Sequence, residues 1–446
     1  MEGASAFDES TLTGLQSVMY VTRRKPKELY RNITACRICG DTNLADCVSF
    51  GRQFLSTTFV DTNEGHPLSD AKVPLSLVLC AGCHTLQLKE SVDRTSLYGD
   101  YSYRNSANPT KRMVLKEIVA DVIGRVDITK GDAVLDIGAN DGTLLSYYPN
   151  NVRRIGVEPA SNISWADLDR SIAIINGAFS ADNVKPVMGQ SQCKIITTVT
   201  MLSGVQDLHT FARDVKSLLA DGGVWCIQVS YLPQLLDTLT FHEVCHEHLY
   251  YFSLGTLKSL LEKNGLSIFD VSTNTASGGS IRAFATHSEK ARKKTAAYDD
   301  MLKAEAKLAL DEAKTYAAFH KRLLKLKATI KSFIRQEHEA GYTIAGLGAS
   351  SKANVMLQFF DIDKHVLPYI SERNPDKVSL RTLGTDIELV SERRARHLNP
   401  DVMMVLPWHL KSELIRREKR YLENGGKLMF PMPYPHIVTR CGETLL

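Results

Sequence analysis

Residues 133–143, AVLDIGANDGT, are the stretch that decides the fold. An apolar run with β-strand composition ends at Gly138 and Gly142, and the helix-like residues Leu144 and Leu145 follow. A strand, a glycine turn and a helix in this order are typical of a parallel sheet, whose carboxyl edge collects backbone N–H groups and ligands. The stretch therefore predicts an α/β domain of the Rossmann-like kind.

A second short strand, RIGVE, follows and ends in Glu158, where an acid can accept hydrogen bonds from a ribose diol. The turn lacks the third glycine of the dinucleotide fingerprint, and Asp136 precedes its first glycine. Asp136-x-Gly-x-x-x-Gly142 resembles the S-adenosylmethionine loop of class I methyltransferases, with an ordinary βα turn as the alternative. The predicted cofactor-binding residues are Asp136, Gly138, Asn140, Asp141, Gly142, Glu158 and Pro159.

Composition and charge limit the class of protein. The chain has 446 residues, 43% hydrophobic and 23% charged, which is ordinary for a globular protein of several domains. The net charge of +4 is small for this length, so neither a nucleic acid polymer nor a membrane surface is an expected partner. The sequence contains no membrane-spanning apolar stretch and no secretory pattern, which predicts a cytoplasmic protein. Its core suffices for a monomer or a weak dimer.

Four of the nine cysteines form two pairs, Cys36-x-x-Cys39 and Cys80-x-x-Cys83. In a reducing compartment such pairs are typical of metal sites rather than disulfides. Four thiolates complete one tetrahedral Zn²⁺ and leave no position for a substrate, so the predicted zinc site is structural and clamps a small β-rich module. A redox dithiol is the alternative, which the two pairs and the lack of a surrounding βαβ pattern disfavour.

Residues 241–253, FHEVCHEHLYYFS, concentrate titratable side chains. His242 and His246 stand four residues apart with Glu243 between them, which formally matches the HExxH pattern of helical zinc sites. A helix here would lack a strong amphipathic pattern, so an acid–base site is favoured over that metal site. The predicted catalytic set has His248 as base, Glu247 as its orienting neighbour, His246 beside them and Tyr251 or Tyr250 as oxyanion donor.

The rest of the chain predicts a second unit of the same kind. Strands and helices alternate from residue 172 to residue 285, as a mostly parallel sheet requires. Residues 288–339 contain neither proline nor glycine and predict one or two long bridging helices. The stretch YTIAGLGASSKAN, residues 342–354, is again a strand, a glycine turn and a helix. Its Ser351 and Lys352 suit an anion, with a plain turn and a surface lysine as the alternative.

The ordered set of motifs resembles the deoxysugar C-methyltransferases, which alkylate nucleotide-linked keto-sugars in bacterial antibiotic and surface-glycan pathways. The resemblance spans about residues 34–437. Its landmarks are the two CxxC pairs, the aromatic loop at 98–106, VLDIGANDGTLL, GVEPA at 156–160, DLHTF at 207–211, HEHLYYFS, GGSIR, the turn at 348–354, ERNPDK at 372–377 and PMP at 431–433.

The resemblance implies an N-terminal zinc module, a central S-adenosylmethionine domain and a C-terminal Rossmann-like domain for the nucleotide of the sugar. The boundaries it suggests are a lead-in at 1–33, the zinc module at 34–95, the methyltransferase domain at 96–287, bridging helices at 288–340 and the C-terminal domain at 341–446. The implied chemistry is proton abstraction beside a ketone by His248, with Tyr103 from the aromatic loop, then attack of the enolate on the methyl sulfonium. The implied substrate-binding residues are Tyr101, Ser106, His209, Gly279, Ser280, Ser351, Lys352, Asn354 and Arg373.

The substrate-facing motifs depart from the family pattern. Cys245 stands where a tyrosine usually precedes His-Glu-His, and Ser277 stands where a histidine usually precedes Gly-Gly-Ser. Because the cofactor and zinc motifs are intact, methyl transfer is favoured, with N- or O-methylation of another small molecule as the alternative. The second alternative is a zinc-stapled, non-catalytic protein that binds a nucleotide sugar.

Overall fold

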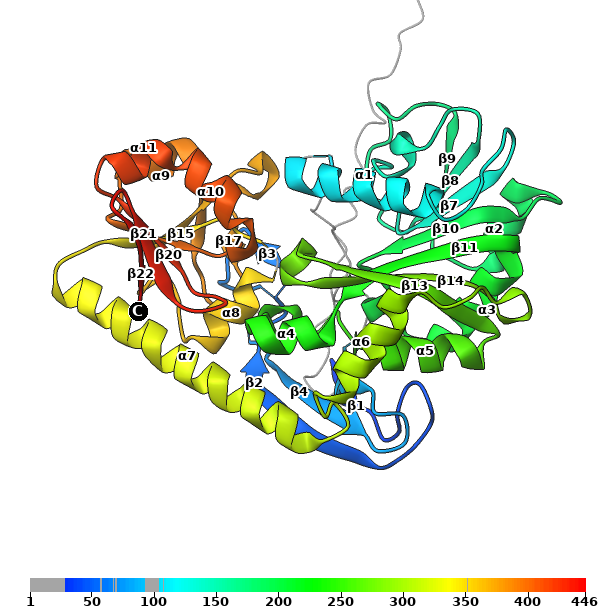
Figure 1. Cartoon of the computed structure of the whole chain (residues 1–446). Coiled ribbons are helices and arrows are strands. Elements are labelled where there is room, and N and C mark those ends of the chain that lie inside the picture. Colours follow the sequence, from blue (N-terminus) through cyan, green and yellow to red (C-terminus); the bar gives the residue numbers. More distant parts are fainter. Residues whose placement is uncertain are drawn as a thin grey trace, which may run out of the picture.

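The computed structural model describes residues 29–56, 58–66, 68, 70–92, 104–106, 108–350 and 352–446. The predicted site residues Tyr101, Tyr103 and Ser351 lie outside the described residues, as does most of the 1–33 lead-in. The described chain forms four sheets, of seven, nine, four and two strands. Figure 1 shows two α/β bodies, cyan to green and orange to red, with the long yellow helix α7 (Ala313–Glu339) running below the orange-red body toward the blue N-terminal strands. The predicted α/β class is confirmed.

The seven-stranded sheet contains the first glycine turn. Its strands, in spatial order, are β13 (Leu266–Asn274), β14 (Ser280–His287), β11 (Leu219–Ser230), β10 (Cys193–Val199), β7 (Ala133–Ile137), β8 (Arg153–Glu158) and β9 (Ile172–Asn176). The strands from β11 to β9 are parallel, and β14 runs antiparallel to both of its neighbours. The strand order reverses at β7, and ligands bind such sheets at the carboxyl end of the reversal point. The glycine turn lies there.

The helices of this unit bury one face each against the sheet. α1 (Pro109–Ile123) starts at Asn108, whose side chain accepts a hydrogen bond from the Lys111 amide, and Leu115 and Ile118 are among its buried residues. Met113 on the same helix is 63% exposed. The other helices are α2 (Ala181–Met188), α3 (Leu208–Leu218), α4 (Leu232–Thr238) and α5 (Leu254–Lys263).

The prediction of a helix directly after the glycine turn is wrong. Leu145 begins only a single 3₁₀ turn, η3 (Leu145–Tyr147). Tyr148 precedes Pro149 and is extended, with ψ of 152°, because the proline ring disfavours the helical conformation of the residue before it. The helix is therefore cut to one turn.

The nine-stranded sheet contains the second glycine turn. Its strand order is β22 (Gly442–Leu445), β21 (His436–Thr439), β20 (Lys427–Phe430), β19 (Val402–Val405), β15 (Ile344–Leu347), β16 (Tyr369–Glu372), β18 (Glu388–Ser391), β17 (Arg381–Thr382) and β3 (Phe59–Val60). The strand order reverses at β15, which is parallel to β16 and β19. The predicted second Rossmann-like unit is thereby confirmed. Its helices are α8 (Ala353–Phe359), α9 (Glu392–Leu398), α10 (Lys411–Arg417) and α11 (Lys419–Glu423).

The N-terminal module pairs with both units. Its own strands are β1 (Tyr30–Asn32), β2 (Leu44–Gln53), β4 (Val73–Cys80), β5 (Leu86–Leu88) and β6 (Glu90–Val92). β12 (Tyr250–Tyr251), which follows the histidine-rich segment, pairs with β5, and β3 of the module pairs with β17 of the C-terminal sheet. Besides its own two-stranded ladder of β1 and β6, the module therefore contributes strands to the four-stranded sheet and, through β3, to the nine-stranded sheet.

Two helices lie in the chain between the seven-stranded and the nine-stranded sheet. They are α6 (Ala296–Ala306) and α7, whose buried residues recur at helical spacing and include Tyr316, Leu323 and Ile330. The opposite face of α7 carries its charged residues and is solvent-exposed. Among the described helices, none is both long and apolar enough to cross a membrane.

Candidate functional site: a zinc knuckle and two glycine turns

The four paired cysteines meet at one point. Their sulfur atoms all lie within 4.8 Å of one another, with Cys36 Sγ 3.5 Å from Cys83 Sγ and Cys39 Sγ 3.4 Å from Cys80 Sγ. Ligand sulfurs of a tetrahedral Zn²⁺ with bonds of about 2.3 Å lie about 3.8 Å apart, whereas a disulfide needs about 2.05 Å. The four thiols fit one structural zinc ion, as predicted.

Neighbouring groups support this knuckle. The Ile38 amide and Gln87 Nε2 donate to Cys36 Sγ at 3.4 and 3.1 Å, and such N–H donors stabilise a ligand thiolate. His209 packs on the same loop, with Nε2 2.6 Å from the Ile38 carbonyl oxygen and Nδ1 accepting from Asn264 Nδ2 at 2.9 Å. Both ring nitrogens of His209, a predicted substrate residue, are thus engaged, one by the zinc module and the other by Asn264 at the end of α5.

The first glycine turn requires its glycines. Gly138 and Gly142 have φ of +82° and +76°. A Cβ on Gly142 would lie 2.7 Å from Leu168 Cδ1, so any larger residue meets both backbone strain and a clash. Asn140 also has a positive φ, which asparagine tolerates better than most residues.

Glu158 closes the other side of this turn. Its Oε2 accepts from the Asn140 amide at 2.8 Å and its Oε1 accepts from the Ala160 amide at 2.9 Å. A carboxylate has about four acceptor sites, so two amides leave capacity for a ribose diol. Pro159 is exposed at the rim of the turn. The residues present fit an adenosyl cofactor at the end of β7.

Asp136 lies beneath the turn and is 3% exposed. Burial raises the pKa of Asp136 to about 7, although the hydrogen bond from Thr197 Oγ1 at 2.6 Å opposes that rise. Above it, the amide of Asn105 donates to Asn140 Oδ1 at 3.0 Å, and the amide of Ser106 donates to Asp141 Oδ2 at 2.8 Å. The end of the aromatic loop, including the predicted substrate residue Ser106, is therefore fixed to the cofactor turn.

The histidine-rich segment is not an α-helix. η5 (Phe241–Glu243) is a single 3₁₀ turn, and an irregular turn follows it. Among the described residues, the only group of three or more possible ligands close enough for one metal ion is the cysteine set. The HExxH hypothesis is therefore wrong, because it requires His242 and His246 on one helical face.

His248 has a fixed tautomer. Its Nδ1 lies 2.9 Å from the backbone carbonyl oxygen of Glu243, which can only accept, so the neutral ring carries its proton on Nδ1. Burial lowers the pKa of His248 to about 4, and the Lys352 ammonium acts in the same direction. The imidazole is consequently neutral at pH 7, with the lone pair of Nε2 available as a base.

Glu243 and Lys352 form an ion pair beside this base. Glu243 Oε2 accepts from Lys352 Nζ at 2.5 Å and from Ser230 Oγ at 2.9 Å, and it lies 3.7 Å from His248 Nδ1. Burial alone would raise the pKa of Glu243, but Lys352 and His248 outweigh it and lower the pKa to about 2. The structure thus brings Lys352, predicted to bind substrate, to the predicted catalytic segment.

The other members of the predicted catalytic set stabilise the segment itself. Tyr251 Oη donates to the His248 carbonyl oxygen at 3.1 Å, and His246 Nε2 lies 3.1 Å from the Pro74 carbonyl oxygen. Glu247 hydrogen-bonds to the Cys245 thiol. The acid against His248 is Glu243, which the sequence had suggested only as part of the HExxH pattern.

The second glycine turn repeats the hydrogen bonds of the first. The Gly348 amide donates to the Ser371 carbonyl oxygen at 2.8 Å, and the Ala349 amide donates to Glu372 Oε2 at 2.9 Å. In the first turn Gly138 bonds the residue before Glu158 in the same way, also at 2.8 Å. Glu372 was not among the predicted site residues, although its place at the end of the second strand is the signal that singled out Glu158.

The remaining predicted substrate residues have varied surroundings. Asn354 is buried, donating to the Leu383 carbonyl oxygen at 3.0 Å and accepting from Thr385 Oγ1 at 2.8 Å. Ser280 is buried and donates to the Ala276 carbonyl oxygen at 2.9 Å. Arg373 is exposed beside Glu372. A Cβ on Gly279 would lie 2.7 Å from Gln234 Cβ, so the paired glycines serve close packing here.

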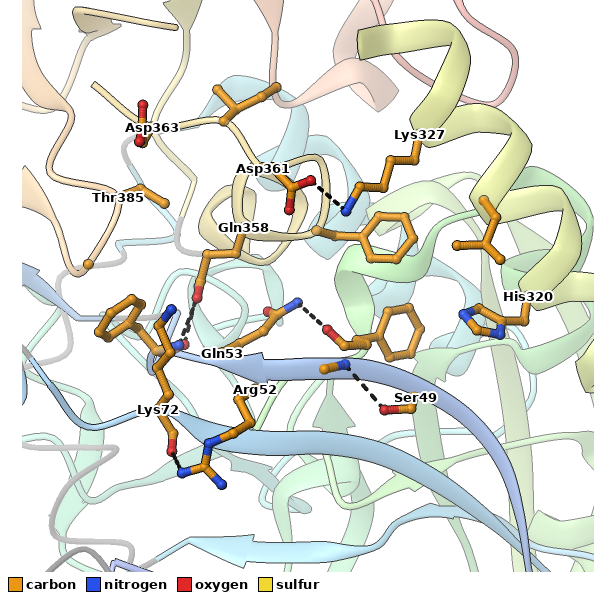
Figure 2. Close-up of a pocket in the computed structure, with 17 residues that line it drawn as sticks. Ser49, Arg52, Gln53, Lys72, His320, Lys327, Gln358, Asp361, Asp363 and Thr385 are labelled. Carbon is orange, nitrogen blue, oxygen red and sulfur yellow. Dashed lines mark hydrogen bonds and ion pairs between the residues drawn. The ribbon is translucent and has the colours of Figure 1, made fainter. Parts of the chain in front are cut away.

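A separate cavity of about 520 Å³ lies where the zinc module meets α7 and the C-terminal unit (Figure 2). Its walls are held by internal contacts: Gln358 exchanges hydrogen bonds of 2.7 and 3.2 Å with the backbone of Phe54, and Lys327 pairs with Asp361 at 2.9 Å. None of the predicted site residues lines it. It marks a packing seam between the module and the C-terminal unit.

Three family models match consecutive parts of the chain. Residues 36–98 match a proposed zinc binding domain, residues 111–271 match a methyltransferase domain, and residues 275–433 match a C-methyltransferase C-terminal domain. Across 415 residues the chain is 29% identical to the C-methyltransferase NovU of Streptomyces niveus, covering 93% of this chain and 99% of that protein.

Solved structures match part of the chain at lower similarity. The CurJ carbon methyltransferase is 17% identical with a TM-score of 0.33, over 44% of this chain and 61% of that one. An S-adenosylmethionine-dependent methyltransferase from Clostridium acetobutylicum is 13% identical with a TM-score of 0.30, over 41% of this chain and 93% of that one.

Proposed function

The chain belongs to the deoxysugar C-methyltransferase family, as an S-adenosylmethionine-dependent enzyme with a structural zinc, and on this premise we propose its acceptor and its base. The acceptor is a nucleotide-linked 4-keto-deoxysugar, and His248 removes the proton next to the ketone. The observation that carries this proposal is the neutral His248, whose side chain is only 14% exposed and whose Nδ1 proton is held by the Glu243 carbonyl oxygen.

His248 acts at Nε2. The C–H bond beside the ketone breaks, its proton moves to Nε2, and its electron pair enters the enolate. A carbon acid of this kind is too weak for an unassisted imidazole, so donors near the ketone oxygen must stabilise the enolate. Tyr251 already donates to a backbone carbonyl, which leaves the aromatic loop with Tyr101 and Tyr103 as the proposed source of these donors.

S-adenosylmethionine supplies the methyl group as an electrophilic sulfonium. Glu158 is the proposed acceptor for its ribose, and the backbone from Gly138 to Gly142 would hold the rest of the cofactor. Lys111 and Asp136 lie within electrostatic range of each other near this turn, and burial together with Lys352 lowers the pKa of Lys111 to about 8. The work left to the protein is to align carbon, methyl and sulfur.

The second turn supports a nucleotide as the other ligand. Glu372 receives the amide of its glycine turn just as Glu158 does, so it is the proposed acceptor for a second ribose. Lys352 follows the same turn and is the proposed partner of the diphosphate. We expect the enzyme to act in the cytoplasm, as a monomer or weak dimer.

The test is a reaction with methyl-labelled S-adenosylmethionine and a panel of 4-keto-sugar nucleotides, followed by mass spectrometry and NMR of the product. A new methyl group on a sugar carbon supports the proposal. A methyl group on nitrogen or oxygen replaces it with the alternative that Cys245 and Ser277 suggest. Failure to bind S-adenosylmethionine in calorimetry would leave only a non-catalytic nucleotide-sugar-binding protein.

A further inference from the structure

The ion pair between Glu243 and Lys352 connects the two units at the base. Glu243 belongs to the His248 segment, whereas Lys352 follows the glycine turn of the C-terminal sheet. The side chain of Glu243 is 4% exposed and that of Lys352 is 26% exposed. A buried carboxylate is thus neutralised by a lysine that still reaches solvent.

The two partners act on His248 in opposite senses. The Lys352 ammonium disfavours an imidazolium at His248, and the Glu243 carboxylate favours one. Glu247 also favours the imidazolium, while His242 is kept neutral because burial lowers its pKa to about 3. While Lys352 is paired with Glu243, its ammonium offsets most of the electrostatic stabilisation that the carboxylate could give to a protonated His248.

An anion in the C-terminal unit would compete for Lys352. Trp408 and His409 follow β19, the strand next to β15; Trp408 is buried and packs edge-on against His242, and His409 is partly buried. Trp408 Nε1 and His409 Nδ1 have no hydrogen-bond partner among the described residues, and an indole N–H can only donate. The Lys111 ammonium faces the same ion pair from α1. These donors and cations favour an oxyanion with more charge than one carboxylate.

We propose that the diphosphate of the substrate draws Lys352 away from Glu243 and so leaves the Glu243 carboxylate to stabilise the His248 imidazolium. The inference rests on the proposed function, because it assumes a nucleotide-linked acceptor. Before substrate binds, His248 is a weak and neutral base. Once the diphosphate is docked, the same ring accepts the substrate proton at Nε2 with a carboxylate beside its Nδ1–H. The base is therefore strengthened by the part of the substrate that does not react.

The first experiment titrates His248 in the full-length protein by NMR of ¹⁵N-labelled histidine, with and without inorganic pyrophosphate as probe. The His248 signal is assigned by its loss in His248→Gln. We expect pyrophosphate to raise the pKa of His248 by one unit or more in the wild type. Each unit corresponds to a tenfold change in the protonation equilibrium of the imidazole. The rise should disappear in Glu243→Gln and in Lys352→Met, and persist in Lys352→Arg.

The variants should differ in their free states as well. Lys352→Met should already have the raised pKa without pyrophosphate, whereas Glu243→Gln should have the low pKa in both conditions. Lys419→Met, at an exposed lysine paired with Glu423 on α11, is the matched control and should behave as the wild type. Thermal melts of each variant show whether the fold is retained.

The second experiment compares the acid limbs of kcat and kcat/KM for methyl transfer. In the wild type the limb for kcat, which reports the substrate complex, should lie one unit or more above the limb for kcat/KM, which reports the free enzyme. The two limbs should coincide in Glu243→Gln, with kcat reduced about tenfold or more. A merely structural role for Glu243 would lower activity without moving one limb relative to the other.

Failure of the switch and failure of the proposed function have different signatures. Absence of pyrophosphate binding at millimolar concentration, or binding that leaves the His248 pKa unchanged, overturns the switch whatever the acceptor is. A pyrophosphate-induced rise that persists in Glu243→Gln overturns it too. The His248 pKa could rise with pyrophosphate in the expected pattern while no keto-sugar nucleotide is methylated. That result would support the effect of the anion on His248 and refute the proposed acceptor.

Discussion

A single nitrogen atom, His248 Nε2, is the base in the proposed chemistry. Replacing His248 by asparagine keeps an N–H group where Nδ1 meets the Glu243 carbonyl oxygen, but removes the proton acceptor. Loss of a general base costs about 10²–10⁴-fold, so we expect kcat for methyl transfer to fall by at least about a hundredfold. Exchange of the acceptor's α-proton with deuterated water should fall in parallel.

Exposed His365 provides the control for this substitution. His365→Gln should keep both rates, and unchanged melting of the His248 variant would show that the fold survives. A His248→Asn enzyme with undiminished proton exchange would refute the assignment of the base.

A second prediction at this scale concerns cofactor affinity. Glu158→Ala removes the carboxylate at the end of β8, and hydrogen bonds to charged groups contribute about 1.5–3 kcal/mol. We expect the Kd for S-adenosylmethionine in calorimetry to rise about tenfold to a hundredfold. Glu117→Ala, an exposed acid on α1, should leave the Kd unchanged. Equal Kd values for the two variants would contradict the role of Glu158.

At the scale of elements, the glycine turn can be tested with a matched pair of alanines. Gly142→Ala meets positive φ and a clash with Leu168, whereas Gly131→Ala meets positive φ of +92° but open space. We expect Gly131→Ala to destabilise the protein by about 1 kcal/mol and Gly142→Ala by about 1–3 kcal/mol more. Urea midpoints measure both values.

The comparison of the two alanines separates the cost of the steric clash with Leu168 from the cost of the positive φ angle. Indistinguishable midpoints would mean that Leu168 gives way freely and that packing does not require Gly142. Bound S-adenosylmethionine should increase the difference, because the altered turn would also bind the cofactor less well.

The local pattern of apolar and turn residues predicted most strands and helices of the chain. It did not predict those whose formation depends on distant parts of the chain. The β7 strand and the acid of β8 followed from apolar runs and turn residues that lie within one short window. The predicted helix after the turn is ended by Pro149 after a single 3₁₀ turn. Pro149 is a local signal, but the apolar pair Leu144-Leu145 had more weight in the prediction. β12 cannot be predicted from the sequence because two residues carry no periodicity, and its pairing with β5 is set by the packing of the zinc module.

At the scale of the whole molecule, zinc should stabilise more than its own knuckle. The module supplies β3 to the C-terminal sheet and pairs with β12 next to the histidine-rich segment. We expect one zinc per chain by elemental mass spectrometry. Chelation or Cys80→Ser should lower the Tm by several degrees and remove methyl transfer, since the site contributes folding energy directly.

Cys441 is exposed and far along the chain from the knuckle, so Cys441→Ser is the control and should keep zinc, Tm and activity. A zinc-free protein with normal activity would show that the knuckle is dispensable for the catalytic site.

Buried neutral histidines should make the molecule acid-sensitive. Burial lowers the pKa of His242 to about 3 and that of His248 and His409 to about 4, whereas the unfolded chain takes up these protons near pH 6.5. The unfolded state then binds more protons than the folded state between about pH 6.5 and 4, so stability falls as the pH falls through that window.

A histidine with its pKa lowered to about 4 costs about 2 kcal/mol by pH 5. We expect the urea midpoint to fall clearly from pH 7.5 to pH 5, and His409→Gln to flatten part of that slope. A midpoint constant across this range would contradict the neutral burial of these rings.

The assembly of the candidate site from two units could not be predicted from the sequence. The cysteine set was predictable because ligand spacing is chemical and local. The pairing of Glu243 with Lys352 depends on how the C-terminal unit packs against the methyltransferase unit. No sequence pattern in either segment predicts contact with the other segment. Adjacency in the sequence favours Glu247 as the partner of His248, whereas Glu243 reaches His248 because the chain turns back on itself.

The pairing of β3 with β17 also has a consequence for synthesis on the ribosome. Val60 and Arg381 are register partners, so this ladder joins segments more than three hundred residues apart. At about 5–20 residues per second, roughly 15–65 s separate their emergence. During that interval the nascent N-terminal strand has no partner, and the cell must shield it or leave it extended. The last sheet to close thus contains one of the first strands to be made.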